Sequence, residues 1–236
     1  MIDSYSISGF SANRTVHTLT KTASIATDNT DVKALTVETA KSDEATLSAL
    51  ARQLGDSAVR AANRDASLSP KELGGFGKAV IDKLIGNSYY GNKAAHDAEV
   101  PDSNDPELLE RAKRATLFTN KTGTNPFTGL SQDQLRLIIY DESGNYTINE
   151  RKAAYTENDR QEQIWKRAIC QRYVDEYCET GKSTETLVMI LAHYNELPPI
   201  EKAQYPANFA ANLTSDDSSA MAIFNRLQIQ SAGPEA

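Results

Sequence analysis

The stretch INERKAAYTENDRQEQIWKRAICQRYVDEYCET, residues 148–180, decides the fold class of this chain. No glycine or proline interrupts it. Thr147 precedes it and Glu150 follows three residues later, which is the pattern of a capping box, and Gly181 is a residue typical of the end of a helix. The sequence therefore predicts one long helix over about 148–180 and, with it, an all-α protein.

Apolar and aromatic side chains recur along this segment at the three- and four-residue spacing of a helix face. Such a stripe is more typical of a core-facing surface than of a ligand-binding box. We therefore expect it to pack inward and to make the long helix the spine of the fold. The stripe comprises Ile164, Trp165, Ala168, Ile169, Tyr173 and Tyr177.

Further helices are expected on both sides of this spine. Ser69 and Ser131 are good N-cap residues, and Glu72 and Gln134 stand three residues after them, as a capping box requires. No segment shows the alternation of apolar and polar residues that predicts a strand. The expected helices begin near residues 43, 70, 105, 131, 183 and 218.

The resulting expectation is an irregular helical bundle over residues 43–230. Two segments interrupt it. Residues 86–105 are rich in turn-forming residues, and loops of this length are often functional or mobile. Residues 120–130 read as a second linker. Whether these two segments divide the helical domain stays open at this point.

The N-terminal residues 1–42 differ in composition from the rest. The first 40 residues contain 13 Ser or Thr, one Phe and one Tyr, and no sustained apolar period. Such a segment cannot bury enough surface to offset its ordering entropy, so we predict a disordered tail. Ser-rich, unstructured tails also serve as uncleaved export signals of bacterial effectors, and both interpretations stay open.

Overall composition excludes several classes of protein. The net charge of −7 disfavours nonspecific binding to nucleic acid or to an anionic membrane. No apolar run approaches the roughly 20 residues that span a bilayer. The start, MIDSYSISGFSANR, lacks the apolar region of a cleaved signal peptide. We therefore expect a protein that is either cytoplasmic or exported without a cleaved signal.

The loop before the long helix carries the candidate metal site. Residues 140–154 read YDESGNYTINERKAA, with side-chain oxygens at alternating positions of a turn between two helices. Ca²⁺ takes six to eight oxygen ligands, which a glycine-containing turn followed by a helical Glu can supply. A ten-residue loop from Asp141 to Glu150 fits this scheme best, although Tyr146 stands where glycine is usual.

This loop thus resembles a degenerate, shortened EF-hand. The resemblance implies weakly held Ca²⁺, with Asp141, Ser143, Asn145 and Glu150 as ligands. The alternative is a plain connection between helices, in which Gly144 or Asn145 adopts a positive φ and Thr147 caps the next helix.

A broader resemblance covers about half of the chain. The run from LSQDQLRLIIYDESGNYTINERKAA (130–154) to LAHYNELPPIEKAQYP (191–206) is similar to a group of uncharacterised Gram-negative bacterial proteins. Those proteins have a Ser/Thr-rich N-terminus before a helical C-terminal half. The resemblance implies organisation and origin, since it includes no catalytic motif.

No enzymatic motif accompanies these features. His17, His96 and His193 are scattered, and the chain has no HExxH, CxxC, P-loop or Rossmann glycine pattern. Cys170 and Cys178, eight residues apart on one helix, are about 12 Å apart along its axis and too distant for a disulfide.

The sequence therefore favours a non-enzymatic helical protein that binds a protein partner and resembles an exported effector. No catalytic residue is assigned, and the oligomeric state is left open. One alternative is an exported enzyme with its active site near loop 86–105. The other is a cytosolic calcium-responsive module.

Overall fold

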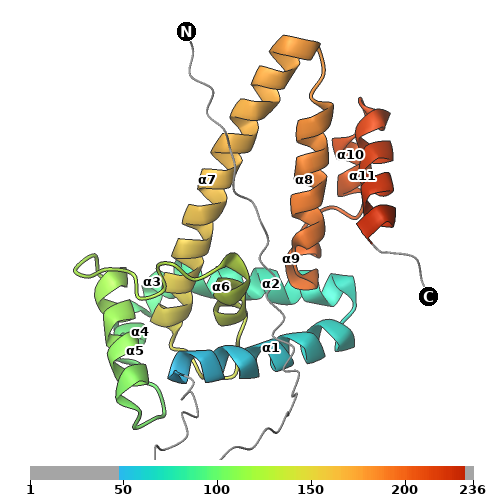
Figure 1. The fold of residues 1–236 in the computed structure, drawn as a ribbon. Helices are drawn as coiled ribbons and strands as arrows, with labels where there is room; N and C mark the ends of the chain where they lie inside the picture. The colour runs from blue at the N-terminus through green and yellow to red at the C-terminus, as the bar shows by residue number, and fades with distance from the viewer. Residues whose placement is uncertain (1–47, 232–236) are drawn as a thin grey trace, which may run out of the picture. The chain divides into compact units, whose positions relative to one another are not determined.

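Helices alone make up the regular structure of residues 48–231, the part of the chain that this computed structural model describes (Figure 1). The all-α prediction is confirmed for these residues. The predicted tail, residues 1–42, lies outside them. The helices are α1 (Ala49–Ser67), α2 (Pro70–Ile85), α3 (Asn87–Gly91), α4 (Lys93–Ala98), α5 (Pro106–Thr119), α6 (Gln132–Ile139), α7 (Ile148–Thr180), α8 (Thr184–Glu196), α9 (Pro199–Lys202), α10 (Phe209–Leu213) and α11 (Ser218–Ser231).

The predicted helix ends form as expected because capping is local. Ser69, Ser131 and Thr147 each accept a hydrogen bond from the third residue of the following helix, and each capping box is complete. Gly181 ends α7 with a left-handed φ of 74°. An N-cap of this kind stabilises a helix by about 1 kcal/mol, which is enough to fix where it starts.

The segment 86–105 is more ordered than its composition indicates. It contains α3 and α4, and the side chain of Tyr89 is buried and donates a hydrogen bond to Asn149 Oδ1 at 2.8 Å. The expectation of a plain turn-rich connection is therefore wrong for residues 87–98. Helices of five and six residues are too short to show a periodic pattern, so tertiary contacts must stabilise them.

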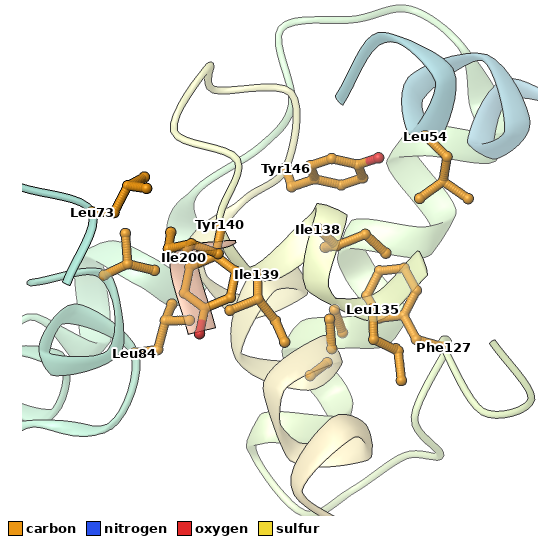
Figure 2. Packing of buried hydrophobic residues seen from close by; sticks show 14 residues of the cluster. Leu54, Leu73, Leu84, Phe127, Leu135, Ile138, Ile139, Tyr140, Tyr146 and Ile200 are labelled. Carbon is orange, nitrogen blue, oxygen red and sulfur yellow. The ribbon is translucent and has the colours of Figure 1, made fainter. Parts of the chain in front are cut away.

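The hydrophobic core surrounds α6 and the first turns of α7 (Figure 2). Leu135, Ile138 and Ile139 on α6 are fully buried, and the small side chains of Ala153 and Ala154 let α7 approach them closely. Side chains from α1, α2, α5 and α9 complete this cluster, namely Leu54, Leu73, Val80, Leu84, Ala115 and Ile200. The predicted linker 120–130 contributes the buried Phe127.

The long helix leaves this core after its first turns. Beyond that point its neighbour is α8, which runs back alongside it, and α11 packs on α8 (Figure 1). Among the described residues, no helix combines the length and the apolar character needed to cross a membrane.

The predicted inward packing of the α7 stripe is wrong for most of its members. Ile169 is buried and Trp165 is half-buried. The other four side chains are exposed: Ile164, Ala168, Tyr173 and Tyr177. The reason is that a single helix, α8, covers this half of α7, and one neighbour can bury only one side of a helix.

Candidate functional site

The loop between α6 and α7 turns tightly and is anchored at both ends by aromatic side chains. Tyr140 and Tyr146 flank it and belong to the hydrophobic core (Figure 2). Gly144 has a φ of 88°, a conformation that glycine adopts without a steric penalty. This backbone matches the plain-turn alternative, and it brings residues 141–150 between α1, α5, α6 and α7.

The carboxylate of Asp141 is buried against α1. Its Oδ2 accepts hydrogen bonds from the Ser57 hydroxyl and from Arg60 Nη2, the latter at 2.6 Å. Its Oδ1 accepts from the Ser143 backbone N–H at 2.8 Å. Burial by itself would raise the pKa of Asp141, but the hydrogen bonds from Arg60, Ser143 and Ser57 outweigh it and lower the pKa to about 2.

The carboxylate of Glu150 is fully buried against α5. Its Oε1 accepts from Arg111 Nε at 2.7 Å, and its Oε2 accepts from the Thr147 backbone N–H at 2.8 Å and from the Thr147 hydroxyl at 3.0 Å. Arg111 also donates to the side chain of Gln53 on α1, and Gln53 donates to the Asn145 carbonyl. These bonds join α1, α5 and the loop.

A third ion pair closes the loop on its other side. Arg151 donates to Glu142 at 2.5 Å and, through two nitrogens, to the Ile139 carbonyl at 3.1 and 2.9 Å. Lys83 of α2 also binds Glu142. Burial would raise the pKa of Glu142, but Lys83 and Arg151 lower it. The loop is therefore a clasp whose ion pairs involve α1, α2, α5 and α7.

Of the predicted calcium ligands, Asp141, Ser143 and Asn145 are joined by hydrogen bonds, whereas Glu150 binds Arg111 and Thr147. All four carboxylate oxygens of Asp141 and Glu150 accept hydrogen bonds, and Arg60 and Arg111 lie against them. Within residues 48–231 no group of three or more His, Cys, Asp or Glu side chains is placed to hold a metal ion. The donors as arranged do not fit Ca²⁺, which would have to displace both arginines. Calcium binding at this loop stays a prediction.

The sequence does not reveal which basic side chains pair with the two buried carboxylates of the loop. Arg60 lies 81 residues before Asp141, and Arg111 lies 39 residues before Glu150. Nothing in the spacing within residues 141–150 reveals that helices far away in the sequence deliver guanidinium groups to both carboxylates.

Within the described part of the chain, the histidines and cysteines are not gathered into one site. His96 stacks on Tyr89, and His193 stacks on Trp165 with ring centroids 3.8 Å apart. Cys170 and Cys178 are free and exposed on α7. His17 lies outside the described residues. The suggestion of an active site near loop 86–105 stays a prediction.

Compared with known protein families, curated proteins and solved structures, the chain matches none of them. The choice of a functional surface therefore depends on the geometry of the chain itself.

The exposed half of α7 carries a continuous apolar surface. Tyr173, Val174 and Tyr177 are 41%, 54% and 58% exposed, and Cys170 is exposed one turn before them. These four residues, here called the α7 strip, have the spacing i, i+3, i+4 and i+7, which places them on one side of a helix. Tyr173 and Tyr177 belong to the stripe whose helical spacing predicts inward packing, whereas Cys170 and Val174 do not.

The strip lies beside, and not under, the contact with α8. The α8-facing side of α7 is marked by Trp165, which stacks on His193, and by Glu176, which accepts hydrogen bonds from the backbone N–H groups of Glu185 and Thr186. At about 100° per residue, Val174 points roughly 160° away from Glu176. The α7 strip therefore faces solvent in this structure.

Proposed function

We propose that the protein acts by binding a partner protein through the α7 strip. The observation that supports this proposal is the exposure of two tyrosines and a valine at helical spacing on the second half of α7. Aromatic side chains are enriched at the centres of protein interfaces, and contiguous apolar patches on a soluble surface mark interaction sites. Apolar residues at i, i+3, i+4 and i+7 suit an amphipathic helix as the partner.

The charged side chains beside the α7 strip indicate what kind of partner helix would bind there. Lys166 and Arg167 stand four and three residues before Cys170, on the strip side of α7, and both are exposed. A partner helix with acidic residues beside its apolar face would complement them. We therefore propose an acidic amphipathic helix of a different protein as the occupant.

A second copy of this chain is a poorer occupant. Two copies packed in the same direction along the strip would bring Lys166 against Lys166. In opposite directions they would bring Lys166 and Arg167 near Lys182, which follows the end of α7. Both arrangements place like charges together, which costs binding energy.

Two labelling positions on α7 provide a matched test. Cys178 lies one turn after Val174, at the edge of the strip, so the control position is Glu179, which is exposed and roughly 180° round the helix from Cys170. A thiol-reactive photo-crosslinker would be attached to Cys170 in a Cys178→Ser variant, and to the introduced thiol in a variant with Glu179→Cys, Cys170→Ser and Cys178→Ser. Extracts of the producing and target cells would then be irradiated with each protein, and the joined peptides sequenced by mass spectrometry.

The proposal expects a Cys170 product that maps to an acidic amphipathic segment and is lost in Val174→Glu. Equal products from both labelled positions would contradict the strip as the surface. A product that maps to this chain itself would replace the proposed occupant with a second copy.

We also propose that residues 1–42 direct export, as in effector proteins. Their Ser/Thr-rich composition supports this proposal. Deletion of residues 1–42 is expected to retain the protein in the producing cell, with folding checked by circular dichroism. Undiminished export of the shortened protein would contradict it.

A further inference from the structure

A cavity of about 340 Å³ lies between α6 and α8, and none of the strip residues lines it. Gln132, Asp133 and Arg136 line it from α6, and His193 and Glu196 line it from α8. This volume is at the lower end for ligand pockets, so the α6–α8 pocket suits one side chain or a molecule of that size. The clasp around residues 141–150 is not part of it.

The only permanent cation in the described lining of this pocket is already engaged. Arg136 is buried, its Nε lies 2.8 Å from Glu201 Oε2, and its Nη1 lies 3.2 Å from Asp133. Its Nη2 donates to the Gln132 side chain at 3.2 Å. A guanidinium with three such partners has little capacity left for an anionic ligand.

Carboxylates exceed cations around the pocket. Asp133 and Glu196 line it, and Glu162 and Glu201 lie directly behind Gln132 and Arg136. Burial raises the pKa of Glu201, and the negative charge of Glu162 adds to this shift, so the two carboxylates sense each other.

The nearby lysines do not remove this excess. Lys166 lies 3.6 Å from Glu162, and Lys202 donates to the Asn195 carbonyl and not to a carboxylate. Glu196 forms no ion pair with any residue that the structure describes. A positively charged group entering the pocket would therefore meet the carboxylate of Glu196, which has no ion-pair partner among the described residues.

An aromatic side chain, His193, lines the pocket. The His193 ring stacks on the indole of Trp165 at an interplanar angle of 18°, and Glu162 lies 3.3 Å from His193 Nε2. Planar guanidinium groups stack on aromatic rings and pair with carboxylates through two parallel hydrogen bonds, which a lysine ammonium cannot do.

We propose that the α6–α8 pocket binds a guanidinium group, with Glu196 and Asp133 as its charge partners and the His193 ring as its stacking surface. The group is supplied either by an arginine side chain of a bound protein or by a free small guanidine. This inference is independent of the α7 strip, because it uses a different surface and a different ligand chemistry.

Trp165 makes the proposal directly measurable. It is the only tryptophan in the sequence, and it is stacked on the ring that lines the pocket. The full chain would be titrated with N-acetyl-arginine methylamide, with tryptophan fluorescence and calorimetry as readouts. The citrulline analogue, which has nearly the same shape and no charge, and the lysine analogue serve as controls.

The arginine compound is expected to bind saturably, and at least about tenfold more tightly than either control, since one lost charge-assisted pairing weakens binding by that order. No saturation, or equal binding of the citrulline analogue, would overturn the proposal. Equal binding of the lysine analogue would overturn its guanidinium specificity.

Charge-removing variants locate the site. Glu196 is exposed and the Asp133 side chain is 86% exposed, so Glu196→Gln alone and Glu196→Gln with Asp133→Asn should both fold. We expect the double variant to weaken arginine binding about tenfold or more, and the matched surface variant Glu179→Gln to leave it unchanged. Unchanged binding in the double variant would contradict the pocket assignment.

The source of the group is resolved by a last pair of ligands, agmatine and the peptide Gly-Arg-Gly. Tighter binding of the peptide assigns the pocket to an arginine of a partner protein. Equal or tighter binding of agmatine assigns it to a free guanidine. Both outcomes support the same chemistry, whereas binding of neither overturns it.

Discussion

The two halves of α7 are packed in opposite ways, although they belong to one uninterrupted helix. In the first turns, the polar side chains of Asn149, Glu150 and Arg151 are buried and bonded. In the last turns, Tyr173 and Tyr177 are exposed. The comparison shows that the number of neighbouring helices, and not the polarity of a side chain, decides burial along this helix. Burial of polar groups is tolerated where each finds a partner.

The largest effect is expected at the buried end of α7, from Glu150→Ala. This change leaves the guanidinium of Arg111 without its carboxylate partner and removes the capping box, and breaking a buried ion pair costs about 3–5 kcal/mol. Urea unfolding followed by circular dichroism measures the loss. Glu179→Ala, at the exposed end of the same helix, should change the free energy of unfolding by less than about 0.5 kcal/mol. Similar losses in both variants would contradict the contrast between the two halves.

A second test truncates an apolar side chain in the core and one in the strip. Ile138→Ala creates a cavity in the core and should lower the free energy of unfolding by about 2–5 kcal/mol. Val174→Ala removes an exposed, β-branched side chain and should leave stability unchanged or raise it by a few tenths of a kcal/mol. Thermal melts of both proteins compare them. A large loss in Val174→Ala would mean that the strip is covered in solution.

Low pH should reduce the stabilising contribution of the clasp before it affects the exposed half of α7. The pKa of Asp141 falls from an ordinary value of 3.8 to about 2 on folding, so its contribution is complete above pH 4. This contribution is about 2 kcal/mol, and it is lost as the pH falls from 4 toward 2.

Unfolding free energies measured across this range should therefore decline less steeply in Asp141→Asn than in the unaltered protein. Asp175→Asn, an exposed substitution in the second half of α7, should keep the original slope. The prediction fails if Asp141→Asn follows the same acid limb as the unaltered protein.

The smallest effect is expected from calcium. Because Arg60 and Arg111 already neutralise Asp141 and Glu150, millimolar Ca²⁺ should leave the melting temperature where it is in a chelator. Scanning calorimetry with and without the ion checks this. A rise with Ca²⁺ that disappears in Asp141→Asn would show that the ion displaces the arginines, and would support the calcium-binding prediction.

Features that depend on a few adjacent residues could be predicted from the sequence. The capping boxes at Ser69, Ser131 and Thr147 and the glycine end at Gly181 follow from local hydrogen bonds. The turn at Gly144 follows from the conformational freedom of glycine. These signals gave the helix boundaries of α2, α6 and α7.

Features that depend on distant contacts could not be predicted. The stripe assigned to the core spans more than half the circumference of α7, which a single neighbour such as α8 cannot cover. The partners of Asp141 and Glu150 come from α1 and α5, and the sequence does not specify which helices meet. The α6–α8 pocket was missed for the same reason, since it combines residues from helices that are separated by all of α7.

The Arg60–Asp141 pair also has a consequence for the order of events during synthesis. Its members enclose about a third of the chain, and long loops of this kind are slow to close. On the ribosome, α1 emerges early and gains this partner only after residue 141 has been made. The first helix therefore cannot form this ion pair until residue 141 has been synthesised. Nascent chains that end before α6 should lack a stable fold.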